Sequence, residues 1–202
     1  TNEWNLKKIH PLITSYVIPK KKFESFKMYI KLYISKALNI KFSENDTVFI
    51  KSIDKSRLNR TNITPNGAVV PKREFHLEYN LILRSWTQLV KQITHNNSKL
   101  LKLFRITPNV RIKFGKELSD NKKRSLSTSY PHSDAWVEGP WGMNCFIPFF
   151  GDTKNNNMIY YEPISKFDEN FLKTSPTYTK MQWVTKYYKP IKNLNPKPGT
   201  VY

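Results

Sequence analysis

The segment PHSDAWVEGPWGMNCFIPFF, residues 131–150, decides the predicted fold. Its tripeptide His132-Ser133-Asp134 follows a β-prone run at 125–131, and an aromatic, glycine-bearing loop then leads to an apolar run at 143–150. Side chains two residues apart at the end of a strand lie on the same side of the pleat, so His132 and Asp134 can converge on one ion. An imidazole and a carboxylate placed in this way are two of the three ligands of a 2-His-1-carboxylate iron site. The segment therefore predicts strands that end at a metal centre.

The composition predicts one folded domain over residues 1–202. A chain of 202 residues is long enough for a single core, and 39% hydrophobic with 14% aromatic residues is typical of a globule rather than a disordered chain. The single Cys145 rules out an internal disulfide framework and fits a reducing compartment. No apolar run approaches the roughly 20 residues that a membrane-spanning helix needs. These features predict a soluble, cytoplasmic protein.

The chain is strongly basic, with 34 Lys and Arg against 15 Asp and Glu and a net charge of +19. The basic residues are spread along the whole length, and the two runs Lys20–Lys22 and Lys122–Arg124 are of the kind that usually form solvated faces. Richness in Lys, Asn, Ile and Tyr together also suggests codon bias. This distribution argues against nucleic acid as the main partner, but such a surface would attract an anionic substrate.

The first half of the chain is predicted to be mainly helical. Apolar residues at helical spacing predict helices over Lys22–Leu38 and Glu74–Thr94, and a short helical piece over Ser98–Leu103 is predicted to follow a capping Asn. The second helix should bury a stripe formed by Ile82, Trp86, Leu89, Val90 and Ile93. Residues 57–72 are predicted to be a loop and Thr47–Ile53 a short strand. Residues 1–19 are predicted to be irregular, with Trp4, Leu12 and Ile13 as anchors.

After residue 104 the pattern changes to alternation with frequent turns. Strands are predicted at 104–106, 110–114, 126–131, 143–149 and 158–162, with a last one from Thr200. Helices followed by an antiparallel sheet make an α+β plan, and short strands with long loops suggest a jelly-roll barrel. The chain begins without Met and stops where the Pro198-Gly199 turn opens a strand. We therefore expect a helical layer over 1–103 and a barrel over 104–202 that is truncated at its C-terminal end.

The features from His132 to Pro163 resemble the iron(II)- and 2-oxoglutarate-dependent oxygenases of the phytanoyl-CoA dioxygenase-like group. They are most similar to the branch found with carbohydrate and streptomycin biosynthesis genes. In that branch a His-x-Asp strand is followed by an Asn-x-aromatic-hydrophobic-Pro strand, here Asn144 to Pro148, and then by a polar turn and another strand. Pro196-Lys-Pro-Gly199 stands where the family's Pro-x-Gly turn leads into the strand with the second His. The resemblance covers residues 104–202 and implies a double-stranded β-helix, the jelly-roll or cupin-like fold.

The resemblance implies that His132 and Asp134 are the catalytic pair and bind iron. The implied cofactors are Fe(II) and 2-oxoglutarate, and the implied reaction is hydroxylation of a small molecule, related to carbohydrates or nucleotide sugars, with release of succinate. The cofactor carries the oxidative chemistry, so no protein nucleophile is needed. The second His and the Arg that grips the distal carboxylate of 2-oxoglutarate have no counterpart in this sequence. Truncation explains this absence better than loss of function in a metal-free pseudoenzyme.

Three further residues are candidates for binding the cosubstrate. The amide of Asn144 could hydrogen-bond a carboxylate, or Asn144 could be an ordinary polar residue at a strand edge. Arg111 shares a strand face with Lys113, and one of them could bind 2-oxoglutarate, although solvent exposure is the default for both. Tyr130 precedes His132 by two residues and is placed to line the pocket.

The loop over the metal supplies the candidates for substrate contact, which are Trp136, Glu138 and Trp141. Its aromatic rings could stack on a sugar or could simply pack. Glu162 is a minor alternative for the third metal ligand, whereas His76 and His95 are expected at the surface or at helix ends.

The sequence leaves two other functions open. One is a metal-free, cupin-like protein that binds a sugar or an anion, and the other is a nucleic-acid-associated protein on the same fold. Iron binding would separate the enzyme from the first, and salt-sensitive binding to nucleic acid would favour the second.

Overall fold

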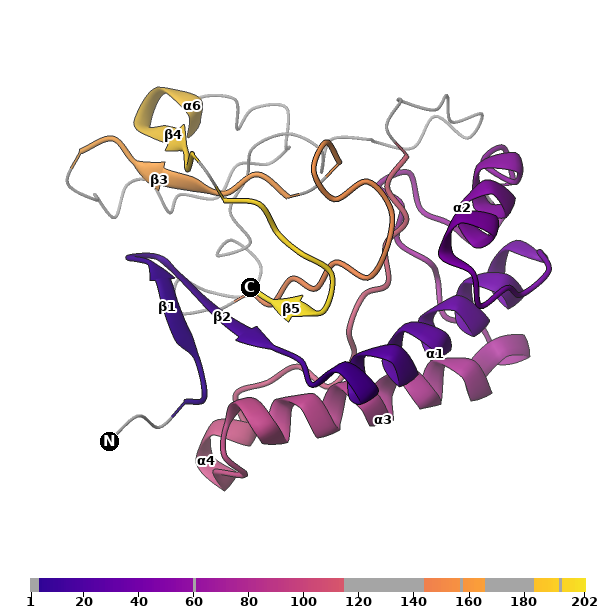
Figure 1. Ribbon diagram of the computed structural model, residues 1–202, viewed down its shortest axis with the longest axis horizontal. Coiled ribbons are helices and arrows are strands. Elements are labelled where there is room, and N and C mark those ends of the chain that lie inside the picture. Colours follow the sequence, from indigo (N-terminus) through magenta and orange to yellow (C-terminus); the bar gives the residue numbers. More distant parts are fainter. Residues whose placement is uncertain (1–3, 60, 115–143, 157, 166–183, 193) are drawn as a thin grey trace.

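The computed structural model describes residues 4–59, 61–114, 144–156, 158–165, 184–192 and 194–202. Its elements in order are β1 (Lys7–His10), β2 (Ile13–Val17), α1 (Lys20–Leu38), α2 (Asp46–Lys55), η1 (Arg73–Phe75), α3 (His76–Ile93), α4 (Ser98–Leu101), β3 (Tyr161–Pro163), α6 (Val184–Tyr187), β4 (Tyr188–Pro190) and β5 (Thr200–Val201). The long helices lie to one side of the strands (Figure 1). In this part of the chain, no helix combines the length and the apolarity needed to cross a membrane.

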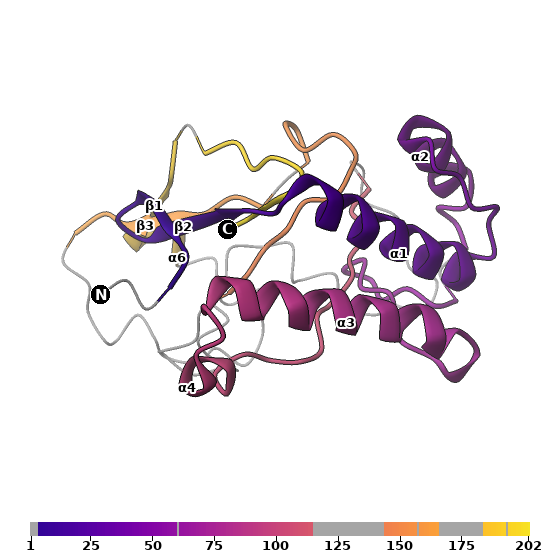
Figure 2. The same ribbon diagram turned by 60° about the horizontal axis from the view of Figure 1, so that its bottom comes forward.

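Helices α1 and α3 lie side by side and build most of the hydrophobic core (Figures 1 and 2). Both predicted helices are confirmed, and α3 buries the stripe that the sequence predicted from Ile82 to Ile93. The predicted short helix is confirmed as α4, where the side chain of Asn97 accepts hydrogen bonds from the backbone N–H groups of Lys99 and Leu100. These elements were predictable because a buried stripe and a capping residue are both local signals.

The prediction of a strand at Thr47–Ile53 is wrong, because this segment forms α2. The side chain of Asn45 accepts a hydrogen bond of 3.0 Å from the Val48 N–H and caps the helix. Phe49 and Ile53, four residues apart, are its buried residues. A cap and a one-sided apolar face therefore outweigh the β-propensity of the branched and aromatic residues in this segment.

The prediction that residues 1–19 are irregular is also wrong, since they contain the antiparallel hairpin of β1 and β2. Ile13 is buried as expected, but Leu12 is 61% exposed and anchors nothing. Trp4 packs beside Phe104, with 5.8 Å between the ring centroids. The hairpin belongs to a larger sheet, because β5 from the far end of the sequence pairs with β2.

The first sheet has the strand order β1-β2-β5, and all its pairs are antiparallel. Residues 144–149 run beside β5, where Phe146 and Tyr202 exchange both backbone hydrogen bonds, at 2.8 and 2.9 Å. Pro148 has no N–H to extend this pairing, but its carbonyl accepts a hydrogen bond from Gly199 at 3.2 Å. The strand predicted at 143–149 is thus an irregular neighbour of β5 in its described part, and the strand predicted from Thr200 is confirmed as β5.

The second sheet consists of β3 and β4, which are antiparallel. The strand predicted at 158–162 begins later, at Tyr161, although the Tyr160 carbonyl already accepts a hydrogen bond of 2.8 Å from Ile191. Along the chain, 144–149 pairs with β5 and the two segments between them, β3 and β4, pair with each other. The pairing is therefore nested.

The remaining strand predictions have mixed outcomes. Residues 104–106 form no strand, and 110–114 form only a short ladder with 67–69, in which Val69 donates to Val110 and Ile112 to Gly67, both at 2.8 Å. The strand predicted at 126–131 lies outside the described residues. The described residues of 57–72 are a loop with isolated bridges, as expected apart from these contacts.

Candidate functional site

The two faces of the first sheet have different surroundings. Directly opposite residues of paired strands share a face, so Tyr16 and Val201 lie on one face and Tyr202 and Phe146 on the other. Val201 is buried in the core that α1 and α3 form, and Tyr16 packs against that core. The opposite face also carries Ile13 and Ser15, which are buried but lie outside the core cluster. We call it, for short, the open face of the first sheet.

An ion-pair network joins the open face to the second sheet. His10 pairs with Ile13 of β2 and so lies on the open face, and its Nε2 is 3.1 Å from Oε2 of Glu162 on β3. The other carboxylate oxygen of Glu162 is 3.4 Å from Nζ of Lys189, directly across on β4. This contact brings the His10 end of the open face against the Glu162 side of β3, and we call this region of contact the inter-sheet space.

The hydrogen bonds of His10 assign its proton. The Leu12 N–H donates to Nδ1 of His10 at 3.2 Å, so Nδ1 is unprotonated and Nε2 carries the hydrogen that faces Glu162. The Glu162 carboxylate is thus held by a ring N–H and by the ammonium group of Lys189. Both oxygens are engaged, which argues against the alternative that Glu162 is the third metal ligand.

Tyr160 is the unusual polar residue of this region. It precedes Glu162 by two residues, and its carbonyl continues the β3–β4 ladder, so its side chain shares the side of Glu162. Its hydroxyl oxygen is buried and has no hydrogen-bond partner among the described residues. Burial first, and then the nearby Cys145 and Tyr202, raise the pKa of Tyr160. The phenol is therefore a protonated donor at neutral pH, and leaving such a group unpaired costs about 1–3 kcal/mol.

Tyr202 adds another polar side chain to the open face. Asn144 lies two residues before Phe146, before the paired part of this segment, and is exposed. The hydroxyl of Tyr202 accepts a hydrogen bond of 2.9 Å from the Lys197 N–H. The predicted cosubstrate ligand Asn144 is exposed, and its role stays a prediction.

Arg111 lies in a different part of the fold. Val110 and Ile112 are buried, whereas Arg111 and Lys113 share the exposed face of the ladder with 67–69, as alternation predicted. Partial burial of its ammonium group and, next, the charge of Arg111 lower the pKa of Lys113. The ladder that carries Arg111 is separate from the two sheets around the inter-sheet space. Cosubstrate binding by Arg111 therefore gains no support from these contacts.

The other predicted site residues lie outside the described residues. They are His132, Asp134, Tyr130, Trp136, Glu138 and Trp141. His76 and His95 are exposed at the two ends of α3, as expected. Within the described ranges, no three His, Cys, Asp or Glu side chains come together as a metal ion would require.

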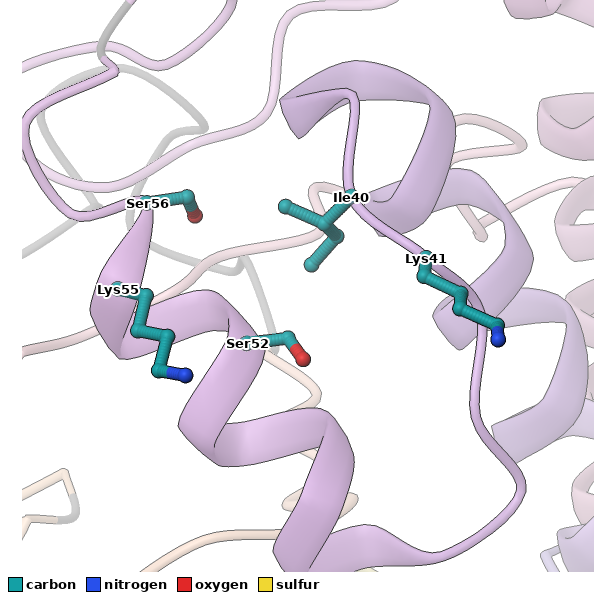
Figure 3. Close-up of a pocket in the computed structure, with 5 residues that line it drawn as sticks. All are labelled: Ile40, Lys41, Ser52, Lys55 and Ser56. Atoms are coloured by element: carbon teal, nitrogen blue, oxygen red, sulfur yellow. The ribbon is translucent and has the colours of Figure 1, made fainter.

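A shallow hollow of about 300 Å³ opens between the ends of α1 and α2 and is lined by Ile40, Lys41, Ser52, Lys55 and Ser56 (Figure 3). The two lysines come from different elements and lie on opposite sides of it. Both serine hydroxyls donate to carbonyls of their own helix. Two helix C-termini, which are negative poles, meet here and oppose the attraction of the lysines for an anion. The hollow is therefore a poor candidate for an anion site.

Sequence reasoning missed Tyr160, Tyr202 and the pairing of His10 with Glu162. The two-residue spacing of Tyr160 and Glu162 indicates that they share a face of a strand. It does not indicate which part of the fold that face contacts. No family model, curated protein or solved structure matches this chain.

Proposed function

We propose that this protein is a non-haem Fe(II)- and 2-oxoglutarate-dependent oxygenase that hydroxylates a small molecule. The observation that carries the proposal is the motif His132-x-Asp134, followed in order by the Asn144 to Pro148 segment. By the resemblance given above, the substrate is related to carbohydrates or nucleotide sugars. A surface with a net charge of +19 suits a substrate that bears phosphate or carboxylate.

A jelly-roll barrel for the second half of the chain is part of this proposal, and the nested strand pairing is compatible with it. A jelly roll is a long antiparallel hairpin folded over, so that its outer and inner pairs belong to two facing sheets. Here 144–149 with β5 is the outer pair and β3 with β4 is the inner pair. The bridge from His10 to Glu162 joins the two sheets. A barrel of this kind would have its interior in the inter-sheet space.

In this proposal His132 and Asp134 hold the iron, together with a second histidine. One imidazole and one carboxylate fit Fe(II), and the open positions suit a cosubstrate that chelates through oxygen. His10 is a poor source of the second imidazole because both of its ring nitrogens already have partners. Bound iron and 2-oxoglutarate supply the oxidising chemistry, which ends in succinate, carbon dioxide and a hydroxylated product.

The remaining predicted residues have binding roles in this proposal. Asn144 and Tyr130 would orient 2-oxoglutarate, with Arg111 as a weaker candidate. Trp136 and Trp141 would stack on the substrate and exclude water, and Glu138 would accept its hydroxyl hydrogens.

Succinate formation tests the proposal directly. The intact protein is incubated with Fe(II) and 2-oxoglutarate, and succinate and bound iron are measured. Replacing His132 or Asp134 by Ala should abolish succinate formation and iron binding. The loss should exceed the roughly 10–100-fold that removal of an outer-shell partner of a metal ligand costs. Ser133→Ala is the matched control and should retain activity, because alternation along the predicted strand would place residue 133 on the other side from His132 and Asp134.

Other results would redirect the assignment. Wild-type turnover by either Ala variant would overturn the proposal. A protein that binds sugars without iron would be the cupin-like binding module instead. Binding to nucleic acid that is tolerant of sequence and weakens steeply with salt would indicate the nucleic-acid-associated alternative.

A further inference from the structure

We propose that Asn66 is a deamidation site, and that opening of the turn at residues 62–70 controls its reaction. Asn66 is followed by Gly67, and the sequence contains no other Asn-Gly pair. Glycine has no side chain to obstruct its backbone nitrogen, so an Asn-Gly pair is the one in which an Asn side chain is most easily attacked. Only water is needed as a co-reactant, and the chemistry is independent of the proposed function.

The reaction proceeds in two steps. The backbone nitrogen of Gly67 attacks Cγ of Asn66 and forms a C–N bond, while its proton and the side-chain amide group leave together as ammonia. Water then adds to either carbonyl of the resulting succinimide ring and breaks one of its C–N bonds. The products are aspartate at residue 66, or isoaspartate, in which the main chain runs through the side-chain carbon.

The turn holds both reacting groups in place. The Gly67 N–H donates to the Thr64 carbonyl at 2.9 Å, so the attacking nitrogen is engaged. The Thr64 hydroxyl donates to Oδ1 of Asn66 and accepts a hydrogen bond of 2.9 Å from the Ala68 N–H. The Ala68 carbonyl in turn accepts a hydrogen bond of 2.8 Å from the Thr64 N–H. Attack on Cγ therefore requires the hydrogen bonds around Thr64 to break.

Gly67 is also fixed from its other side. It is buried, its φ is +85°, and its carbonyl accepts a hydrogen bond of 2.8 Å from the Ile112 N–H. The carbonyl oxygen of Ile112 lies where a Cβ of Gly67 would be, so the peptide has no room to turn toward Asn66. The ladder with residues 110–112 must therefore open first, and local opening costs less free energy than global unfolding. Isoaspartate would add one carbon to the main chain and prevent this ladder from closing again.

The test measures aspartate and isoaspartate at residue 66 by peptide mass spectrometry, during incubation of the intact protein at neutral pH. We expect the folded protein to react at least about tenfold more slowly than the same protein in concentrated guanidinium chloride, because only its opened fraction reacts. Thr64→Val removes the two hydroxyl contacts and should speed the reaction of the folded protein about tenfold, as expected from the net worth of one to two hydrogen bonds.

Thr64→Ser is the matched control, because it keeps the hydroxyl, and its rate should equal that of the wild type. Asn62 is an internal reference, since it lies in the same turn but is followed by Ile63, whose branched side chain obstructs attack. Asn62 should stay unmodified under the same conditions. Circular dichroism shows whether each variant is folded.

Several results would overturn the inference. A wild-type protein that reacts equally fast when folded and unfolded has no gate, and this comparison decides alone if Thr64→Val does not fold. A folded Thr64→Val protein that reacts no faster than the wild type would show that Thr64 does not restrain the reacting groups. A slower reaction would show that the hydroxyl promotes attack by polarising the Asn66 carbonyl. An unfolded protein that stays unmodified at Asn66 would rule out the deamidation site altogether.

Discussion

The charged group of Lys31 is buried under helix α2, and this burial leads to a sharp prediction. Lys31 is 2% exposed, and its ammonium nitrogen lies 2.6 Å from Oδ1 of Asp46. It also donates to the carbonyls of Glu44 at 2.5 Å and Ser43 at 3.3 Å. The ring of Phe49 lies 5.4 Å from it, within the range of a cation–π contact. The ion pair therefore ties α1 to the first turn of α2.

The two partners should be strongly coupled. Removing the partner of a buried charge costs about 3–5 kcal/mol, and Asp46→Asn should fall near the lower end, about 3 kcal/mol, because Asp46 is 40% exposed. Lys31→Met leaves Oδ1 of Asp46 buried without its ion-pair partner, which costs about 2 kcal/mol. The double variant removes both charges and should also cost only about 2 kcal/mol. The expected coupling energy is therefore about 3 kcal/mol.

Urea unfolding monitored by circular dichroism measures this coupling, since the midpoint and slope give the free energy of unfolding for each variant. Lys36→Met is the matched control, because Lys36 is exposed on the same helix and its loss should change stability by no more than about 0.5 kcal/mol. The reasoning would be refuted if the double variant lost as much stability as Asp46→Asn and Lys31→Met together, to within about 0.5 kcal/mol.

Two further predictions concern acid stability and a glycine. Burial alone would raise the pKa of Asp46, but hydrogen bonds and charges from Lys31 and Lys27 outweigh it and lower that pKa. A lowered carboxyl pKa stabilises the fold above the unfolded value of about 3.9, and this contribution is lost as the pH falls through the folded pKa. The difference in unfolding free energy between wild type and Asp46→Asn should thus be constant from pH 7 to 5 and smaller at pH 3; a constant difference at all three values would contradict this. Gly67 has a φ of +85°, and an added Cβ would collide with the backbone carbonyl oxygen of Ile112. Gly67→Ala should therefore cost about 3 kcal/mol, whereas Gly151→Ala, with a φ of +100° but open space around it, should cost about 1 kcal/mol. Equal thermal shifts in the two variants would argue against the collision.

The local signals of the sequence were sufficient for the long helices. The stripe from Ile82 to Ile93 repeats with the helical period, and Asn97 caps the helix that follows it. Both signals act within a few residues, so they could be recognised without knowing the fold. The same kind of signal predicted that Arg111 and Lys113 share an exposed face.

Local propensity misled where two local signals competed. The β-branched and aromatic residues after Asp46 favour a strand, but the Asn45 cap and the spacing of Phe49 and Ile53 produce a helix. The hairpin at residues 7–17 was missed for a different reason. Its strand β2 is stabilised by β5, with Tyr16 opposite Val201, and no local pattern reveals a partner so distant in the sequence.

The sequence by itself determined the local chemistry of this protein, which is the His132-x-Asp134 motif, the helical stripes and the excess of positive charge. Only the tertiary structure decided that His10 meets Glu162, and that the unpaired hydroxyl of Tyr160 lies on that side of β3. The physical reason is that alternation along a strand determines which residues share a face, whereas the packing of one sheet against another decides what that face meets.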